Sequence, residues 1–174
     1  MVKKSERKGH KTSDKSATAK SILNRRANFD YELSDDLVVG LELTGAEVKS
    51  ARLGRVQLVG SYVTLRENPQ TKRTELFLIN TSFTLQNSMP KNSGEKSTII
   101  DTRSRKILAK RKQIDALSTA RQQGKTILPT KLLTNGKYIK LVIALGKGKK
   151  HYDKRESIKR KDLIRENARL LKKL

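Results

Sequence analysis

The sequence contains no cysteine and only two histidines. Without cysteine there is no disulfide framework, no thiolate nucleophile and no cysteine-ligated zinc, and a reducing compartment fits this composition. His10 and His151 lie in charged terminal segments, where no packed surroundings would hold either one as a metal ligand or general base. We therefore predict that the protein is not an enzyme and has no catalytic residue, cofactor or metal.

Long apolar segments are also missing. No run of about 18 apolar residues could span a bilayer, and the N-terminus lacks the apolar stretch of a signal peptide. We expect a cytoplasmic protein without a membrane partner. A phosphate-binding loop of the G-x-x-x-x-G-K-[ST] type is absent, and the adjacent acids Asp35 and Asp36 suit a turn better than a metal site.

Basic residues are plentiful. Forty Lys and Arg stand against 17 Asp and Glu, a net charge of +23, while apolar residues make up only 34% of the 174. Such a charge disfavours a compact chain unless a polyanion neutralises it, which points to nucleic acid as the partner. The length suits one domain, and the low apolar fraction predicts that part of the chain forms tails.

The positive charge is concentrated at the two ends. Residues 1–26 hold nine Lys and Arg against two acids, and residues 147–174 hold twelve against four. We divide the chain into a disordered basic arm (1–23), a β-barrel RNA-binding domain (24–146) and a basic C-terminal tail (147–174) that is helical when bound. Apolar residues at helical spacing in 156–174 predict that helix, with permanent packing on the barrel as the alternative.

Strand-like alternation fills the middle of the chain. Phe29, Tyr31 and Leu33, followed by residues 37–43, predict a hairpin through residues 34–36. Further strands are expected at 62–66, 75–80 and 106–108, with an exposed loop at 87–96. Asn135-Gly136 predicts a second hairpin that leads into a central strand at 137–145, whereas Pro129 argues against a long strand before Leu133.

Two short helices are expected among these strands. Thr44 and Glu47 have the spacing of a capping box, and Gly54 would end that helix near Leu53. Residues 107–123 form the second, ended by Gly124. A mainly β chain with about six strands and short helices suits a small closed antiparallel β-barrel of the oligonucleotide-binding type, with a sandwich as the alternative.

Two segments have the residue types of an RNA-binding surface. Residues 24–29, NRRANF, place two guanidinium groups beside an amide and an aromatic ring that could stack on a base or belong to the core. Residues 147–155, KGKKHYDKR, combine cations with His151 and Tyr152. Glu47 is unusual in such a surface, and it either caps its helix or has a role in RNA recognition.

These segments resemble a known family. NRRANFDYEL, LTGAEVKSARLGRVQL followed by GSYV, TRSRKIL and GKGKKHYDKR are similar, in this order, to signatures of the small protein B family, the tmRNA-binding (SsrA-binding) factors of trans-translation. The resemblance implies a six-stranded barrel that binds the tRNA-like domain of tmRNA and accompanies it, with elongation factor Tu, to stalled 70S ribosomes. The tail would occupy the empty mRNA channel near the small-subunit ribosomal RNA of the decoding centre.

By position, the resemblance implies two sets of site residues. The tmRNA-facing set is Asn24, Arg26, Glu47, Lys49 and Lys140. The ribosome-facing set in the tail is Lys147, Lys149, Lys150, Tyr152, Asp153, Lys154 and Arg155. A monomer is expected.

The chain departs from the family at a few positions. Asn28 and Phe29 stand where Arg and His are common, and Tyr152 stands where His is frequent. The main alternative is a general structured-RNA-binding or ribosome-associated protein without tmRNA specificity. A membrane-surface protein that uses the tail as an amphipathic helix is less favoured, because that helix lacks Trp and Phe.

Overall fold

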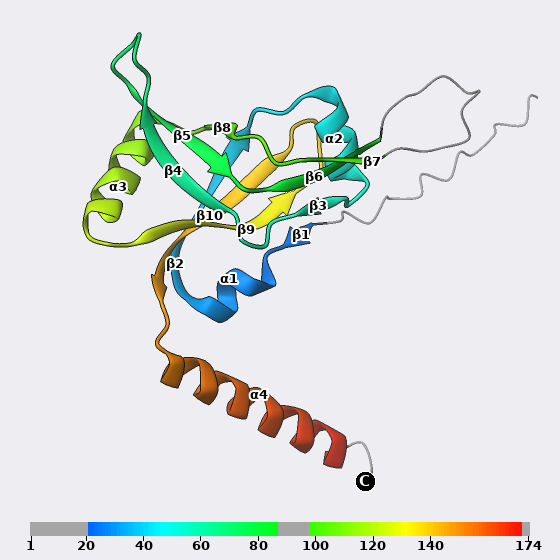
Figure 1. Cartoon of the computed structure of the whole chain (residues 1–174). Helices are drawn as coiled ribbons and strands as arrows, with labels where there is room; N and C mark the ends of the chain where they lie inside the picture. The colour runs from blue at the N-terminus through cyan, green and yellow to red at the C-terminus, as the bar shows by residue number, and fades with distance from the viewer. Residues whose placement is uncertain (1–20, 87–97, 172–174) are drawn as a thin grey trace, which may run out of the picture.

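The computed structural model describes residues 21–86 and 98–171, which form ten strands and four helices (Figure 1). The strands are β1 (Ile22–Leu23), β2 (Tyr31–Leu41), β3 (Val56–Gln57), β4 (Tyr62–Glu67), β5 (Thr74–Ile79), β6 (Ser82–Gln86), β7 (Thr98–Asp101), β8 (Arg105–Leu108), β9 (Thr126–Leu133) and β10 (Lys140–Gly148). The helices are α1 (Arg25–Asp30), α2 (Gly45–Arg52), α3 (Arg111–Gln122) and α4 (His151–Leu171).

Most strands belong to one antiparallel sheet. Its seven strands have the order β1-β9-β10-β2-β8-β5-β4, and β3, β6 and β7 form a second sheet of three. Val63 of β4 also pairs with Ile127 of β9. The strand at one edge of the large sheet, β4, is therefore paired with β9, the second strand from the opposite edge. The protein is therefore mainly β with a large antiparallel sheet and short helices, as predicted, although it has more strands than the six expected.

β10 is the central strand, as the sequence predicted. It pairs antiparallel with β9 on one side and with β2 on the other. Gly136, in the connection from β9, has a φ of 86°, a conformation that glycine adopts without strain. The hairpin at Asn135-Gly136 is confirmed, but β10 begins at Lys140, three residues later than expected.

The predicted hairpin at residues 34–36 is wrong. β2 continues through these residues and pairs with β10 on both sides of them, with Ile143 opposite Leu37 and Leu145 opposite Ser34. Two residues of β2 therefore oppose one of β10, which is a β-bulge, and Asp35 takes a φ of 56° there. The turn-forming composition of this segment produces a bulge in a long strand.

The expected interruption at Pro129 is also wrong. β9 runs through Pro129, and the register against β10 shifts by one residue at Thr130. Pro129 stays in register with Ile143 although it has no amide hydrogen to donate, and the neighbouring Thr130 is the extra residue of a bulge. The Thr130 hydroxyl donates to the Val142 carbonyl at 3.2 Å across the irregular position.

The two predicted helices are confirmed, with one changed boundary. α2 follows its N-cap Thr44 and ends before Gly54, whose φ of 73° is the usual glycine stop. α3 begins at Arg111 rather than 107, because the preceding residues pair as β8. α1 was not predicted: Phe29 lies in this helix and not in a strand.

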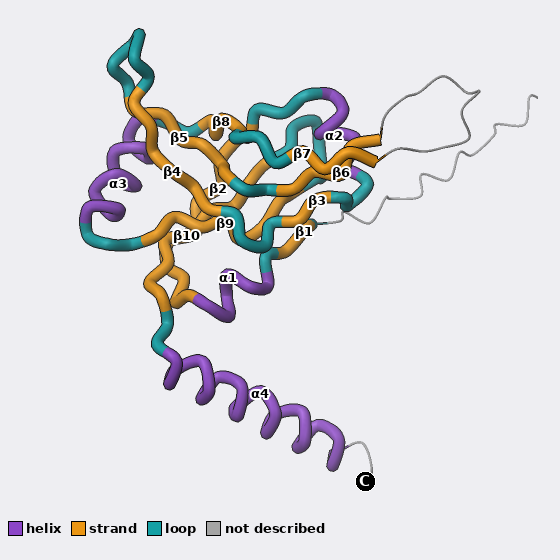
Figure 2. Tube along the Cα trace, in the orientation of Figure 1, coloured by secondary structure: helices purple, strands orange, loops and turns teal. Residues whose placement is uncertain are grey.

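The core is formed by residues of both sheets together with residues of α2 and α3. It contains side chains that are almost completely buried, among them Phe83, Leu76, Leu78, Leu132, Leu141 and Ile143. By contrast, α4 projects away from the sheet on the side where α1 lies (Figures 1 and 2). Residues 1–20 of the predicted arm and the predicted loop at 87–96 lie outside the described residues, and Ile22–Leu23 of the arm form β1.

Candidate nucleic-acid interface

Asn24 is the N-cap of α1, and its side chain is engaged inside the protein. Its amide nitrogen donates to the carbonyls of Leu58 (3.0 Å) and Pro129 (2.9 Å), and its oxygen accepts from the Ala27 amide at 3.2 Å. Only 3% of the residue is exposed. In this arrangement Asn24 fastens α1 to β9 and to the segment after β3, and thereby positions the next turn of the helix.

Arg26, two residues later, is an exposed cation. Its Nε donates to Asp30 Oδ2 at 2.6 Å, while 65% of its side chain stays accessible. Its guanidinium also lies 5.8 Å from the centre of the half-buried Phe29 ring. Phe29 and Asp30 therefore both contact the Arg26 side chain, which limits its conformations without covering it.

Glu47 is completely buried and lies between two arginines. Its carboxylate accepts two hydrogen bonds from Arg103, at 2.9 and 2.6 Å, and a third from Arg105 Nε at 2.7 Å. The Thr44 amide donates to the same carboxylate at 2.7 Å, as the predicted capping box requires. The carboxylate thus caps α2 and also fixes Arg103, whose side chain remains 44% exposed.

The environment of Glu47 keeps it ionised. Burial alone would raise the pKa of its carboxyl, but the hydrogen bonds from Arg103 and from the Thr44 amide, with the charge of Arg105, hold that pKa below its ordinary value. Arg105 is itself fully buried, and its guanidinium lies 4.0 Å from the centre of the Phe83 ring. Burial lowers the pKa of Arg105, although the nearby carboxylate opposes this effect.

Lys49 and Lys140 are exposed cations, the first on the same helix as Glu47 and the second on β10. Lys49 lies on α2 and lines a small pocket with Arg55 and Thr84. Lys140 is the first residue of β10 and is in register with Gly40 of β2. Figure 1 places α1 and α2 well apart, so the predicted tmRNA-facing residues do not form one cluster but are spread over three elements.

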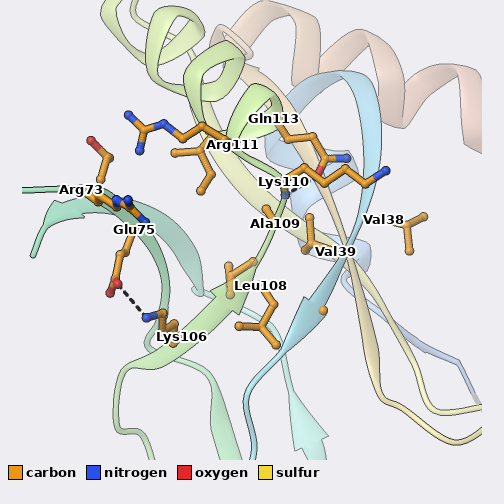
Figure 3. Close-up of a pocket in the computed structure, with 14 residues that line it drawn as sticks. Val38, Val39, Arg73, Glu75, Lys106, Leu108, Ala109, Lys110, Arg111 and Gln113 are labelled. Carbon is orange, nitrogen blue, oxygen red and sulfur yellow. Dashed lines mark hydrogen bonds and ion pairs between the residues drawn. The ribbon is translucent and has the colours of Figure 1, made fainter. Parts of the chain in front are cut away.

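A groove of about 580 Å³ lies beside Gly40, between β2, β8 and the start of α3 (Figure 3). Val38 and Leu108, which are 52% and 53% exposed, line it together with Ala109. Its cations are Arg73, Lys106, Lys110 and Arg111. Lys106 pairs with Glu75 at 2.7 Å, and its hydrogen bond lowers the pKa of the Glu75 carboxyl. The groove thus combines accessible apolar groups with surrounding positive charge.

The predicted ribosome-facing residues cover the end of β10 and the start of α4. Lys147, Lys150, Tyr152, Asp153 and Arg155 are exposed, Tyr152 to 74%. The Asp153 carboxylate accepts from the Lys150 amide at 3.1 Å, which satisfies a free amide at the start of α4.

Lys149 and Lys154 instead contact α1. Lys149 donates from Nζ to the Asn28 carbonyl at 3.1 Å, and Lys154 Nζ lies 2.9 Å from Asp30 Oδ1. Asp30 therefore bonds to Arg26 and to Lys154, one residue from each predicted set. The hydrogen bond from Lys154, followed by that from Arg26, holds the pKa of Asp30 below its ordinary value.

Asp30 and Arg103 are parts of the site that the sequence does not predict. Arg26 and Asp30 have the i, i+4 spacing of an ion pair on a helix, but the alternation that starts at Phe29 predicts a strand there. Arg103 occurs in the TRSRKIL segment, and its partner Glu47 is 56 residues away in the chain. No local pattern predicts that pairing.

The described residues offer neither a metal-binding cluster nor a membrane-spanning helix. Within 21–86 and 98–171, no group of three or more His, Cys, Asp or Glu is arranged to hold a metal ion. No helix in this part of the chain combines the length and apolar character needed to cross a membrane.

Comparison with known proteins identifies the family. The SmpB protein family profile matches residues 21–173. The SsrA-binding protein of Oenococcus oeni is 39% identical over 150 residues, which cover 86% of this chain and 90% of the relative. The SsrA-binding protein of Prochlorococcus marinus (strain MIT 9515) is 38% identical over 175 residues, 99% of this chain and 100% of the relative.

A solved structure agrees with the sequence relatives. A chain from "tmRNA-SmpB: a journey to the center of the bacterial ribosome" superposes with a TM-score of 0.54 at 31% identity, and the alignment covers 79% of this chain and 94% of that one. The family profile covers both the sheets and α4. This chain therefore belongs to the SmpB family.

Proposed function

We propose that this chain binds the tRNA-like domain of tmRNA and delivers it to stalled ribosomes for trans-translation. The observation that carries this proposal is the family match over residues 21–173. The match includes both α4 and the body of the protein, by which we mean residues 21–148 with all the strands and α1 to α3. The net charge of +23 supports an RNA partner, because the release of counterions from phosphates drives such binding. The non-enzymatic role is part of the same proposal.

The tmRNA-facing residues divide into contacts and supports. Arg26, Lys49 and Lys140 are exposed and would meet phosphate or base edges directly. Asn24 and Glu47 are buried and have their hydrogen-bonding groups occupied by protein, so we assign them the support of α1 and of Arg103. Arg103, which Glu47 holds in place and which is partly exposed, would contact the RNA instead of Glu47 itself.

The groove beside Gly40 extends this surface. Val38 and Leu108 offer accessible apolar groups against which a ribose or base can pack, and the surrounding cations can hold the phosphates. Lys140 lies in register with Gly40 and so adds a cation next to the groove. We also propose that the large sheet forms a closed barrel of the oligonucleotide-binding type. The pairing of Val63 with Ile127 supports this closure.

The tail would act on the ribosome. We assign Lys147, Lys149, Lys150, Tyr152, Asp153, Lys154 and Arg155 to contacts in the empty mRNA channel near the decoding centre, with α4 stabilised as a helix by that binding. Tyr152 is 74% exposed and keeps the stacking capacity of a ring. Elongation factor Tu would take part through the tmRNA complex, with the protein as a cytoplasmic monomer.

A competition assay tests this function against its alternative, a general structured-RNA-binding or ribosome-associated protein. Labelled tmRNA is bound by the full chain and displaced by unlabelled tmRNA, tRNA or ribosomal RNA fragments at fixed salt. We expect tmRNA to compete at least about 1,000-fold better than the other RNAs, the lower end of the usual ratio of specific to nonspecific binding. Equal competition by all three would support the alternative.

A further inference from the structure

The connection between β10 and α4 is short. β10 ends where Gly148 pairs with Tyr31 of β2, and α4 begins three residues later at His151. Along α4, Ile158, Leu163 and Ile164 are 45%, 60% and 60% exposed, so these apolar side chains do not hold the helix against the sheet. Figures 1 and 2 show α4 leaving the body beside the end of α1. The direction of the helix must therefore be set near its first turn.

Contacts with the end of α1 lie on both sides of this junction. Before the helix, the Lys149 amide donates to the Asp30 carbonyl at 2.9 Å, and Lys149 Nζ donates to the Asn28 carbonyl at 3.1 Å. Inside the helix, Lys154 Nζ lies 2.9 Å from the Asp30 carboxylate. The backbone bond fixes a point about which α4 can rotate, and the Lys154 contact holds the helix at one angle.

Asp30 contacts residues before and within α4. Its backbone carbonyl accepts a hydrogen bond from the Lys149 amide, and its carboxylate pairs with Lys154 at Oδ1 and with Arg26 at Oδ2. Its side chain is only 20% exposed, and that of Lys154 only 27%, so solvent screens this pair less than a fully exposed one. Asp30 thus links the helix that carries Arg26 to the helix that carries the tail residues.

The length of α4 makes this angle important. Its 21 residues extend about 31 Å at 1.5 Å per residue, so a rotation of about 20° at the base moves the far end by about 10 Å. A displacement of that size separates a cation from a phosphate that it should contact.

We infer that Asp30 is a positioning residue that sets the angle at which α4 leaves the body, and so sets the tail relative to the tmRNA-facing surface. This inference rests on the proposed function. Asp30 contributes through Lys154 and Arg26 and makes no RNA contact of its own. Removal of its carboxylate should leave both hydrogen bonds from Lys149 in place and remove the contact with Lys154 inside α4.

A pair of spin labels measures the angle directly. Because the chain has no cysteine, Gln122→Cys on α3 and Asn167→Cys on α4 provide the only two labelling sites. We expect Asp30→Asn to broaden the distance distribution and Asp115→Asn to leave it unchanged, since Asp115 pairs with Arg111 within α3. An unchanged distribution in Asp30→Asn would overturn the inference.

Peptide tagging on stalled ribosomes, measured with tmRNA at saturation, gives the functional result. We expect Asp30→Asn to lower tagging by about threefold, the scale of a partly exposed ion pair, and Asp115→Asn to leave it unchanged. A broadened distribution with full tagging would contradict a positioning role. Failure of the unsubstituted protein to bind tmRNA would instead refute the proposed function, so the two failures are distinguishable.

Discussion

Arg105 and Lys154 both pair with a carboxylate, but in opposite surroundings. Arg105 and its partner Glu47 are completely buried, and the same carboxylate also binds Arg103 and the Thr44 amide. Lys154 and Asp30 are partly exposed at the start of a helix whose apolar side chains face solvent. This basic chain therefore uses one buried cation to hold its core together and another, at the surface, to hold α4 against α1.

The largest expected effect is the loss of the buried carboxylate. Glu47→Ala leaves the buried Arg105 with only the more distant carboxylate of Asp101, 3.4 Å away, as a counterion, so we expect the free energy of unfolding to fall by about 3 kcal/mol. Urea denaturation followed by circular dichroism measures this change. Glu67→Ala is the control, because Glu67 is an exposed acid on β4, and it should change the value by less than about 0.5 kcal/mol. Similar losses in both variants would contradict the structural role of Glu47.

The pH dependence of stability tests whether the ionised carboxylate of Glu47 stabilises the fold. The pKa of Glu47 is lower in the folded protein than its ordinary value of 4.5, so the folded state holds this proton less tightly than the unfolded state does. Its stabilising contribution is complete above about pH 4.5 and is lost as the pH falls through the folded pKa. The unfolding free energy should therefore fall more steeply below pH 4.5 in the unsubstituted protein than in Glu47→Gln. Equal slopes would exclude a depressed pKa at this residue.

The body was the easier part to predict from the sequence. The capping box at Thr44, the glycine stop at Gly54 and the alternation around β4, β5 and β10 are local signals, and the elements that they predict are present. The bulge in β2 was not predictable in this way. Residues 34–36 have the composition of a turn, and only their pairing with β10 keeps the strand continuous.

The candidate site was less predictable than the fold. Family resemblance selected Asn24 and Glu47 as RNA-facing residues, whereas their burial is visible only in three dimensions. Asp30 lies four residues after Arg26 but 124 residues before Lys154, and only the folded chain brings all three together. Long-range ion pairs of this kind leave no periodic signal in a sequence.

Substitution of one isoleucine in the body and one in the tail compares how much each region contributes to stability. Ile143 is completely buried in β10, whereas Ile164 is 60% exposed on α4. In the free protein, Ile143→Ala should lower the unfolding free energy by about 2 to 5 kcal/mol and Ile164→Ala by less than about 0.5 kcal/mol. Urea denaturation of both variants decides this prediction. A comparable loss in Ile164→Ala would mean that α4 packs on the body.

The smallest expected effect concerns a single exposed cation. Lys140→Ala should reduce tmRNA affinity by about threefold to tenfold and lower the slope of log K against log salt by about 0.7 to 0.9, one phosphate contact. Filter binding at several salt concentrations measures both values. The matched control is Lys112→Ala on α3, which lies in a pocket with Asp35 and Asp36 and should change neither. Equal effects of the two variants would remove Lys140 from the interface.

Truncation after Gly148 tests most directly the claim that body and tail have separate roles. The shortened chain keeps every strand, Arg26, Lys49, Lys140 and the groove, and lacks α4. The measurement is tmRNA affinity and peptide tagging on stalled ribosomes, made on the same preparation. The account predicts nearly unchanged tmRNA affinity with tagging abolished. Loss of both activities together, or retention of both, would contradict it.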